Sequence, residues 1–575
     1  MRVSDYIITF LRDLYDVDTI FTVSGGACIF LIDSLGKTSG VKYIATHHEQ
    51  AASIAAEGYA RMNQKLGACV VTSGPGGTNA ITGTLCSWLD SVPVIVLSGQ
   101  VNSDLTTNKT NLPLRQLGDQ EYNIVDTVKS ITKYAVQVND AKKIRYHLEK
   151  ACKIATTGRP GPVWIDIPLD IQSSDIDPSN IEGYDETQIV VKPDKTDIDI
   201  LLENWKSAKK PLLIVGNGVR LSGSVDKLHT LLDKTNLPTI TAVNGNDIVN
   251  SDYDHYYGRF GTHAQICANT LLSECDFLLS IGSRLYVRQI GYNFSGFAKQ
   301  AYRAYVDIDE GELNKPTLFP DLRIHSDAKE FIDELLVCDL PKTERNWLHT
   351  CDKINEAPKV LERHRKNVNY VSHYAFIEEL SNSIPEDHHI VTSDGTANVV
   401  TMQVLDLKKN QRLFTNTGCA PMGYGLPAAI GASVHNNIVL LDGDGSLHLN
   451  IQELQTMKHY DLPIKLILLN NDGYLSIKLT QNAFFNGNYV ASEKTSGVSF
   501  PEFKKIVNAY DIPYFNIKQN KDIHPTLDNF LNERGPCVCE VFTDPDECHE
   551  PKVVATLDED GKFIPGDLHN IQWLS

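Results

Sequence analysis

The sequence predicts an α/β protein built from three doubly wound parallel-sheet domains. Its 575 residues are too many for one hydrophobic core, because single cores stop growing at about 250 to 300 residues. Short apolar runs alternate with helical patterns along the whole chain, which is typical of parallel sheets with crossover helices. Polar or charged stretches at 173–186 and 342–366 separate three such blocks. We therefore expect domains at 1–172, 187–341 and 367–545, followed by a tail at 546–575 that lies over the body.

Each block contains apolar runs that we predict to be buried strands. In the first block they lie at residues 68–72, 92–98 and 163–167. The second block opens with a strand that enters a glycine turn within 210–218 and continues with strands at 277–281 and 304–308. The third has strands at 390–392, 438–441 and 464–469. No short-period repeat is present, which excludes a solenoid.

Composition and charge exclude several classes of function. The formal net charge of -19 and the absence of a long basic run argue against a nucleic-acid partner. No stretch of about 18 apolar residues predicts a membrane span. The N-terminus has no apolar core of a secretory signal, so we expect a cytoplasmic enzyme. The 12 cysteines are scattered without zinc-site spacing and are expected to be buried, reduced side chains.

Polar residues follow two consecutive strands of the third block. The strand at 438–441 ends in Gly443-Asp444-Gly445, and the next strand along the chain ends in Asn470-Asn471. Strands joined by one crossover are normally adjacent, so both tips should meet at the carboxyl edge of the sheet. The Asp444 carboxylate, the Asn471 amide and a carbonyl near Gly473 would offer Mg²⁺ three oxygen ligands. Gly443 and Gly445 would let the backbone approach a diphosphate, although an isolated Gly-Asp-Gly is more often a plain turn.

This pair of motifs resembles the diphosphate motif of the thiamine-diphosphate (ThDP) dependent enzyme superfamily. The resemblance narrows to the acetolactate synthase (acetohydroxyacid synthase) family and covers nearly the whole chain, through segments 24–27, 72–79 and 417–427. It implies a pyrimidine-binding first domain, a central domain and a diphosphate-binding third domain. It also implies ThDP and Mg²⁺ as cofactors, with cofactor-binding positions at Gly25, Gly26, Pro75, Asn79, Ser446, Tyr474 and Leu475 in addition to the residues already named.

Three further residues take catalytic roles through this resemblance. Glu49 matches the glutamate that hydrogen-bonds the aminopyrimidine ring; its other interpretation is a carboxylate at a helix N-terminus, and Glu57 is a nearby competitor expected to be structural. Met422 matches the apolar wedge that bends the cofactor, although methionine also fills cores. Gln120 matches an active-site glutamine, and its other interpretation is a surface amide.

The implied reaction is decarboxylation of a 2-oxo acid such as pyruvate, with transfer of the acyl-anion unit to a carbonyl acceptor. Thr480 stands where the family has an acceptor-binding tryptophan, and Asp119 replaces a phenylalanine. The central block keeps Arg284 and Arg288 but lacks the paired aspartates that flavin-binding members have between them. FAD is therefore a possible cofactor that these residues do not establish. There are three alternatives. The first is a non-ligating decarboxylase, and the second is acetyl transfer to a nucleotide-linked ketosugar, as in a branch associated with sugar and polysaccharide biosynthesis. The third is a catalytically silent binding protein. The resemblance also implies a homodimer or homotetramer with active sites between subunits.

Overall fold

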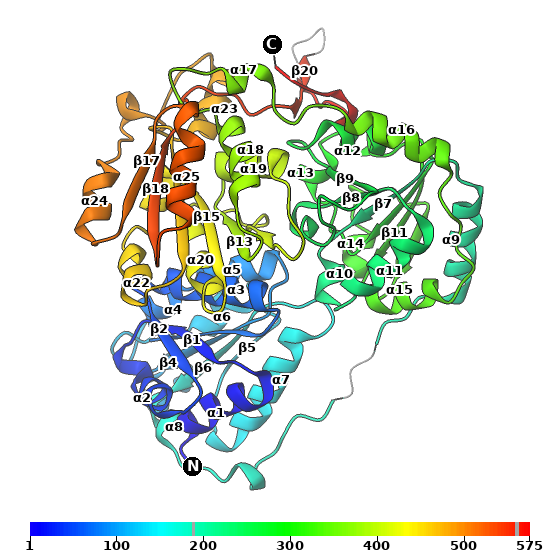
Figure 1. Cartoon of the computed structure of the whole chain (residues 1–575). Coiled ribbons are helices and arrows are strands. Elements are labelled where there is room, and N and C mark those ends of the chain that lie inside the picture. Colours follow the sequence, from blue (N-terminus) through cyan, green and yellow to red (C-terminus); the bar gives the residue numbers. More distant parts are fainter. Residues whose placement is uncertain (187–189, 558–562, 575) are drawn as a thin grey trace.

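The computed structural model describes residues 1–186, 190–557 and 563–574 and contains three separate α/β domains (Figure 1). Each domain has one six-stranded sheet in which every pairing is parallel. Parallel neighbours need crossover helices, and these helices cover the faces of each sheet. The predicted α/β class with three doubly wound sheets is confirmed.

The first sheet has the strand order β2-β1-β3-β4-β6-β5. β4 begins two residues later than expected, directly after Pro93, which has no N–H to give to a strand ladder. The strands are β1 (Thr19–Thr22), β2 (Lys42–Ala45), β3 (Gly67–Val71), β4 (Val94–Gln100), β5 (Tyr134–Gln137) and β6 (Val163–Pro168), and the helices are α1 (Val3–Tyr15), α2 (Ile29–Lys37), α3 (Glu49–Asn63), α4 (Pro75–Asn79), α5 (Ile81–Leu89), α6 (Ile124–Val128), α7 (Ile144–Thr156) and α8 (Leu169–Ser173).

The central sheet has the order β12-β11-β10-β7-β8-β9, with β7 in the position expected for the strand that enters a glycine turn. Its strands are β7 (Pro211–Val215), β8 (Thr239–Thr241), β9 (Tyr256–Arg259), β10 (Phe277–Ile281), β11 (Tyr302–Asp307) and β12 (Leu322–His325). The helices are α9 (Lys195–Ser207), α10 (Gly218–Leu221), α11 (Val225–Thr235), α12 (Ile266–Glu274), α13 (Val287–Ile290), α14 (Glu310–Leu313), α15 (Ala328–Leu336) and α16 (Arg345–Asn355). The next helix, α17 (Glu362–Arg365), packs against the first helix of the third domain.

The third sheet has the order β14-β13-β15-β16-β18-β17, and β15 pairs with β16 so that Gly443 lies opposite Leu469. The two predicted polar tips are therefore adjacent. The strands are β13 (His388–Thr392), β14 (Leu413–Phe414), β15 (Asn437–Gly443), β16 (Ile464–Asn470), β17 (Tyr514–Ile517) and β18 (Cys537–Phe542), and the helices are α18 (His373–Ser383), α19 (Thr396–Val404), α20 (Gly425–Ala432), α21 (Asp444–His448), α22 (Glu453–His459), α23 (Leu475–Phe485), α24 (Phe503–Ala509) and α25 (Ile523–Leu531).

The tail crosses the central and third domains. Its short strands are β19 (Lys552–Val553), β20 (Thr556–Leu557), β21 (Phe563–Ile564) and β22 (Ile571–Gln572). The Val553 N–H donates to the Thr262 carbonyl at 3.1 Å, and the Asn269 side chain donates to the Leu568 carbonyl at 3.0 Å. These contacts hold the tail on the body of the protein.

Helices α3 and α20 join the first and third domains through direct backbone contact. A Cβ atom on Gly58 would lie 2.2 Å from the Ala428 carbonyl oxygen, and one on Gly431 would lie 1.8 Å from the Ala55 carbonyl oxygen. Only glycine permits this approach. One hydrophobic core continues through the contact and contains side chains of both domains, so the two domains form a single packed unit.

Candidate active site

The loops after β1 and β3 form one half of the candidate site, in the first domain. A Cβ on Gly25 would lie 2.5 Å from Cβ of Thr72, and one on Gly76 would lie 2.8 Å from its Cγ2. Thr72 is thus enclosed by two glycine-containing loops. A side chain larger than that of glycine at position 25 or 76 would collide with it. Gly26 is exposed, and a Cβ on it would meet open space.

Glu49 is the first residue of α3 and lies over the neighbouring helix α4. The His48 side chain caps α3 by accepting a hydrogen bond from the Gln50 N–H at 3.0 Å. The Asn79 amide donates to Oε2 of Glu49 at 2.9 Å, and Pro75 opens α4. The half-buried Glu49 carboxylate keeps one oxygen, Oε1, without a hydrogen-bond partner among the described residues.

Glu57, the competitor of Glu49, is fully buried and fully engaged. Its carboxylate accepts hydrogen bonds from Arg61 at 2.7 Å, Tyr424 at 2.6 Å and Asn416 at 3.1 Å. Two of these partners belong to the third domain. The carboxylate therefore holds the domain contact together, in agreement with the structural role expected from the sequence.

Gln120 lies beside the start of α4. Its backbone has a left-handed conformation with φ of 55°, and a Cβ on Gly74 would lie only 2.7 Å from the Gln120 carbonyl oxygen. The Gln120 side chain is exposed, as is that of Asp119. The structure thus brings the backbone of Gln120 to the loop that contains Pro75 and leaves its amide free to turn.

Asp444 and Asn471 converge at the edge of the third sheet. Oδ2 of Asp444 accepts from the N–H groups of Asn471 at 3.0 Å and Gly473 at 3.3 Å, and Oδ1 accepts from Gly445 N–H at 2.7 Å. Both side chains are buried, and burial raises the pKa of Asp444 to about 7. Oδ1 of Asn471 is buried without a hydrogen-bond partner among the described residues. A buried carboxylate beside an unpaired amide oxygen is an arrangement that a cation would stabilise.

Met422 and Tyr474 both pack against Gly445 next to this loop. A Cβ on Gly445 would lie 2.3 Å from Cε1 of Tyr474 and 3.2 Å from Cε of Met422. Ser446 Oγ accepts from the Gly423 N–H at 3.0 Å and so fixes the residue that follows Met422. The methionine is half-buried rather than part of the closed core.

Two backbone segments, at Gly443 and at Leu475, border the second half of the site. Leu475 is buried and begins α23, while a Cβ on Gly443 would meet open space. Helix α21, which begins at Asp444, has only five residues. Local N–H groups rather than a long helix dipole would therefore contact an anion here.

The first and third domains also touch through side chains that lie close in sequence to the two halves of the site. The Asn450 side chain donates to the Gly423 carbonyl at 2.7 Å and to Oε1 of Gln50 at 3.1 Å. The His47 N–H donates to Oε1 of Glu453 at 3.0 Å. No sequence motif predicted the contacts of Gln50 and His47, because their partners lie about 400 residues further along the chain.

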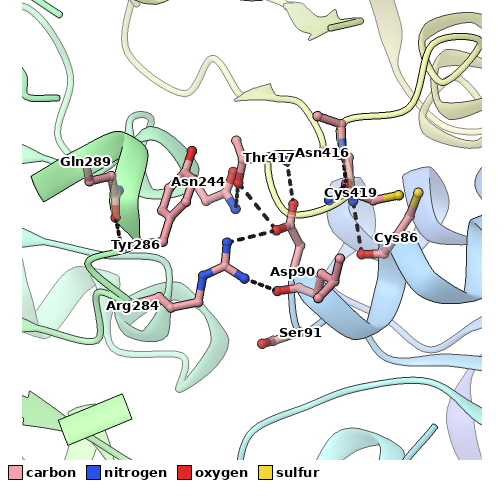
Figure 2. Close-up of polar contacts among 12 residues, drawn as sticks. Cys86, Asp90, Ser91, Asn244, Arg284, Tyr286, Gln289, Asn416, Thr417 and Cys419 are labelled. Atoms are coloured by element: carbon pink, nitrogen blue, oxygen red, sulfur yellow. Dashed lines mark hydrogen bonds and ion pairs between the residues drawn. The ribbon is translucent and has the colours of Figure 1, made fainter. Parts of the chain in front are cut away.

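All three domains meet at Asp90, at the end of α5 (Figure 2). Its carboxylate accepts from Arg61 at 2.8 Å and from the Thr417 N–H at 2.9 Å. Arg284 of the central domain donates to the Leu89 carbonyl at 2.5 Å and lies 3.8 Å from Asp90. A cavity beside this junction is lined by the carboxyl ends of β7, β10 and β11 and by Thr417.

Two features, a metal-binding side-chain cluster and a membrane-spanning helix, are absent from the described residues. No group of three or more His, Cys, Asp and Glu side chains there could hold a metal ion. A site made of one carboxylate, one amide and one carbonyl is of a different kind. Across the described ranges, no helix has the length and apolar character required to cross a bilayer. All 12 cysteines lie in the described part and are free.

Comparison with known proteins defines the class of enzyme to which this chain belongs. Three family models match the chain: "Thiamine pyrophosphate enzyme, N-terminal TPP binding domain" over residues 1–124, "Thiamine pyrophosphate enzyme, central domain" over 198–335, and "Thiamine pyrophosphate enzyme, C-terminal TPP binding domain" over 394–541. Thiamine pyrophosphate is another name for ThDP. The three-sheet fold and these matches define a ThDP-dependent enzyme.

The chain is similar over almost its whole length to acetolactate synthase large subunits. It is 32% identical to that of Lactococcus lactis over 97% of this chain and 95% of the relative, and 31% identical to the isozyme 2 large subunit of Escherichia coli over 95% and 96%. It is 32% identical to a probable acetolactate synthase large subunit of Methanocaldococcus jannaschii over 92% and 90%. The chain belongs to the acetolactate synthase large-subunit family, which confirms the resemblance identified from its motifs.

Proposed function

We propose that this enzyme uses ThDP and Mg²⁺ to decarboxylate a 2-oxo acid, pyruvate first of all, and transfers the two-carbon unit to a carbonyl acceptor. The observation that carries the proposal is the convergence of Asp444 and Asn471 at the ends of two adjacent strands. Bound ThDP would supply a carbon nucleophile and an electron sink for the loss of CO₂.

The residues present fit a magnesium diphosphate. Asp444, the orphaned Oδ1 of Asn471 and the carbonyl of Gly473 would hold Mg²⁺, leaving positions for phosphate oxygens. Gly443, with open space on its Cα, would let those oxygens approach the backbone. Ser446, Tyr474 and Leu475 complete this side of the proposed cofactor site; Gly25, Gly26, Pro75 and Asn79 belong to the other side.

Glu49 is the proposed proton-holding group. A carboxylate that Asn79 orients through one oxygen can share a proton with a ring nitrogen through the other. Met422 would contact the bound cofactor, because an adaptable apolar side chain suits that role. Gln120, with its exposed amide, would donate to the reacting substrate.

Exchange of Glu49 for glutamine tests the proton role. Glu49→Gln should still bind ThDP and Mg²⁺, seen as a thermal shift, while CO₂ release from pyruvate falls about 100-fold or more, because general acid–base groups contribute that much. Glu386→Gln, an exposed carboxylate away from the site, is the control and should be active. Unchanged turnover in Glu49→Gln would eliminate the proposed role.

A second copy of the chain is the proposed partner. Exposed apolar side chains lie near both halves of the site: Leu105, Leu112 and Leu117 are 44–64% exposed, and Leu449 and Ile477 are 54% and 48% exposed. Such side chains commonly mark an interface. A homodimer or homotetramer with sites between subunits would cover them, and light scattering would give the mass in solution.

The central cavity is the proposed place for the adenine nucleotide of FAD. The Asp307 carboxylate lies at the end of β11, where α/β folds commonly bind ribose hydroxyls. Gly216 and Gly282 serve a packing purpose first, since a Cβ on Gly216 would lie 2.2 Å from the Gly282 carbonyl. Visible absorbance of the purified protein and thermal shifts with FAD and ADP would decide whether a flavin is bound.

The choice of acceptor depends on the residue at position 480. Thr480 lies on α23, where its hydroxyl donates to the Ser476 carbonyl at 2.9 Å and its side chain is exposed. This small residue, in place of the family's tryptophan, favours a larger acceptor such as a nucleotide-linked ketosugar. Pyruvate supplied with a panel of keto acids and such ketosugars should yield ligated products by mass spectrometry; acetaldehyde alone would identify a non-ligating decarboxylase instead.

A further inference from the structure

Two thiols face each other where the first and third domains meet. Cys86 lies on α5, and Cys419 lies on the loop of residues 415–424 that carries Met422. Figure 2 shows their sulfur atoms pointing toward one another from these two segments. The sequence predicted no pairing of these two cysteines, because they lie 333 positions apart.

A single side chain holds both cysteine backbones in place. The Asn416 amide donates to the Cys86 carbonyl at 3.0 Å, and its Oδ1 accepts from the Cys419 N–H at 3.0 Å. The same amide also donates to the buried Glu57 carboxylate at 3.1 Å. The relative position of the two thiols is therefore fixed by a buried hydrogen-bond network rather than by mobile loops.

The two thiols differ in access and in acidity. Cys86 is fully buried, whereas Cys419 is partly exposed. The Cys86 thiol, as a donor, lowers the pKa of Cys419, while the same contact and burial raise the pKa of Cys86. A more acidic, reachable thiol beside a buried one is the arrangement of an attacking and a resolving cysteine.

We propose that Cys86 and Cys419 form a reversible disulfide that switches the enzyme off. The oxidant class is a low-molecular-weight disulfide, RSSR, such as glutathione disulfide. The Cys419 thiolate attacks one sulfur of RSSR and releases RS⁻; Cys86 then attacks the Cys419 sulfur, and a second RS⁻ leaves with the Cys86 proton. In sum, two cysteine thiols are oxidised by two electrons and RSSR is reduced to two RSH.

The bond would act on the site through Met422, three residues after Cys419. The sulfur atoms of a disulfide lie about 2.0 Å apart, closer than those of two hydrogen-bonded thiols, so bond formation would draw the 415–424 loop toward α5. Gly423, fixed by Ser446 and Asn450, resists this movement. Met422 would shift from Tyr474 and Gly445, and small displacements at a catalytic centre reduce rates strongly.

The test oxidises the full-length holoenzyme with glutathione disulfide and measures mass and activity separately. Cys338 and Cys548, the other cysteines that are not buried, are replaced by serine so that Cys419 is the accessible thiol that remains. We expect loss of the mass of two hydrogens, a Cys86–Cys419 cross-linked peptide, and a loss of CO₂ release of about tenfold or more that dithiothreitol reverses.

Two variants in the same background serve as controls. Cys86→Ser should retain activity in reducing buffer, stop at the mixed disulfide with glutathione, and gain no cross-link; Cys419→Ser should take up no glutathione. Thermal melting in reducing buffer verifies that both variants are folded. Absence of the cross-linked peptide would overturn the proposal, and so would a cross-link that leaves turnover unchanged. The mass measurement does not depend on the proposed reaction, so the two proposals fail separately.

Discussion

Removal of the charge at Asp444 should stabilise the metal-free enzyme while abolishing its response to magnesium. Burial raises the pKa of Asp444 from its ordinary 3.8 to about 7. A difference of about three pH units is worth about 4 kcal/mol. Because the unfolded chain ionises this group more readily than the folded chain, the free energy of unfolding falls as pH rises from about 4 to about 7 and is constant above that.

The exchange Asp444→Asn removes the ionisation cost and also one acceptor oxygen. Loss of an acceptor for the Gly445, Asn471 or Gly473 N–H groups costs about 1–2 kcal/mol. At pH 8 the metal-free variant should therefore be more stable than the wild type by about 2–3 kcal/mol. At pH 5 the ionisation cost in the wild type has fallen to about 1–2 kcal/mol, and the two proteins should melt together.

Thermal melting at pH 5 and pH 8, with and without Mg²⁺ and ThDP, measures both effects. The proposed magnesium site requires the ionised carboxylate, so an Mg²⁺-induced rise in Tm of the wild type should be large at pH 8 and small at pH 5. The variant should show no rise at either pH. A variant that melts below the metal-free wild type at pH 8, or that responds to Mg²⁺ like the wild type, would refute the reasoning.

Two glycine exchanges test the packing of the site and of the domains. Gly58→Ala places a Cβ 2.2 Å from the Ala428 carbonyl oxygen and should lower the Tm or prevent folding. Gly36→Ala in α2, with open space around it, is the control and should raise the free energy of unfolding by about 0.5–1 kcal/mol. Equal melting of the two variants would contradict the backbone contact. Gly445→Ala places a Cβ 2.3 Å from Cε1 of Tyr474, so the ring must move. ThDP binding should weaken about tenfold or more in a titration at saturating Mg²⁺. Unchanged affinity would argue against this part of the site.

Much of the fold could be predicted from the sequence because the buried strands are short and almost entirely apolar. The site at Asp444 and Asn471 followed from one rule, that consecutive strands joined by a crossover are neighbours, and the register of β15 with β16 agrees with it. Nothing in the local sequence of α3 identified α20 as its packing partner.

The remaining features depend on contacts between distant segments. The hydrogen bonds of Glu57 with Tyr424 and Asn416 join residues more than 350 positions apart. Gln120 has a left-handed backbone with φ of 55° and an exposed side chain, and no local motif predicted this conformation. Such features arise from tertiary packing, which neither hydrophobic periodicity nor a short motif encodes.

The glycine contact between α3 and α20 limits how this enzyme can move. Hinge motion between the first and third domains would have to separate main chains that touch without side chains between them, and would expose a shared core. Entry of substrate and release of product must then depend on smaller parts such as α23 and the tail. Changes of acceptor preference are accordingly expected in those segments, with the joined pair of domains serving as an unchanging base.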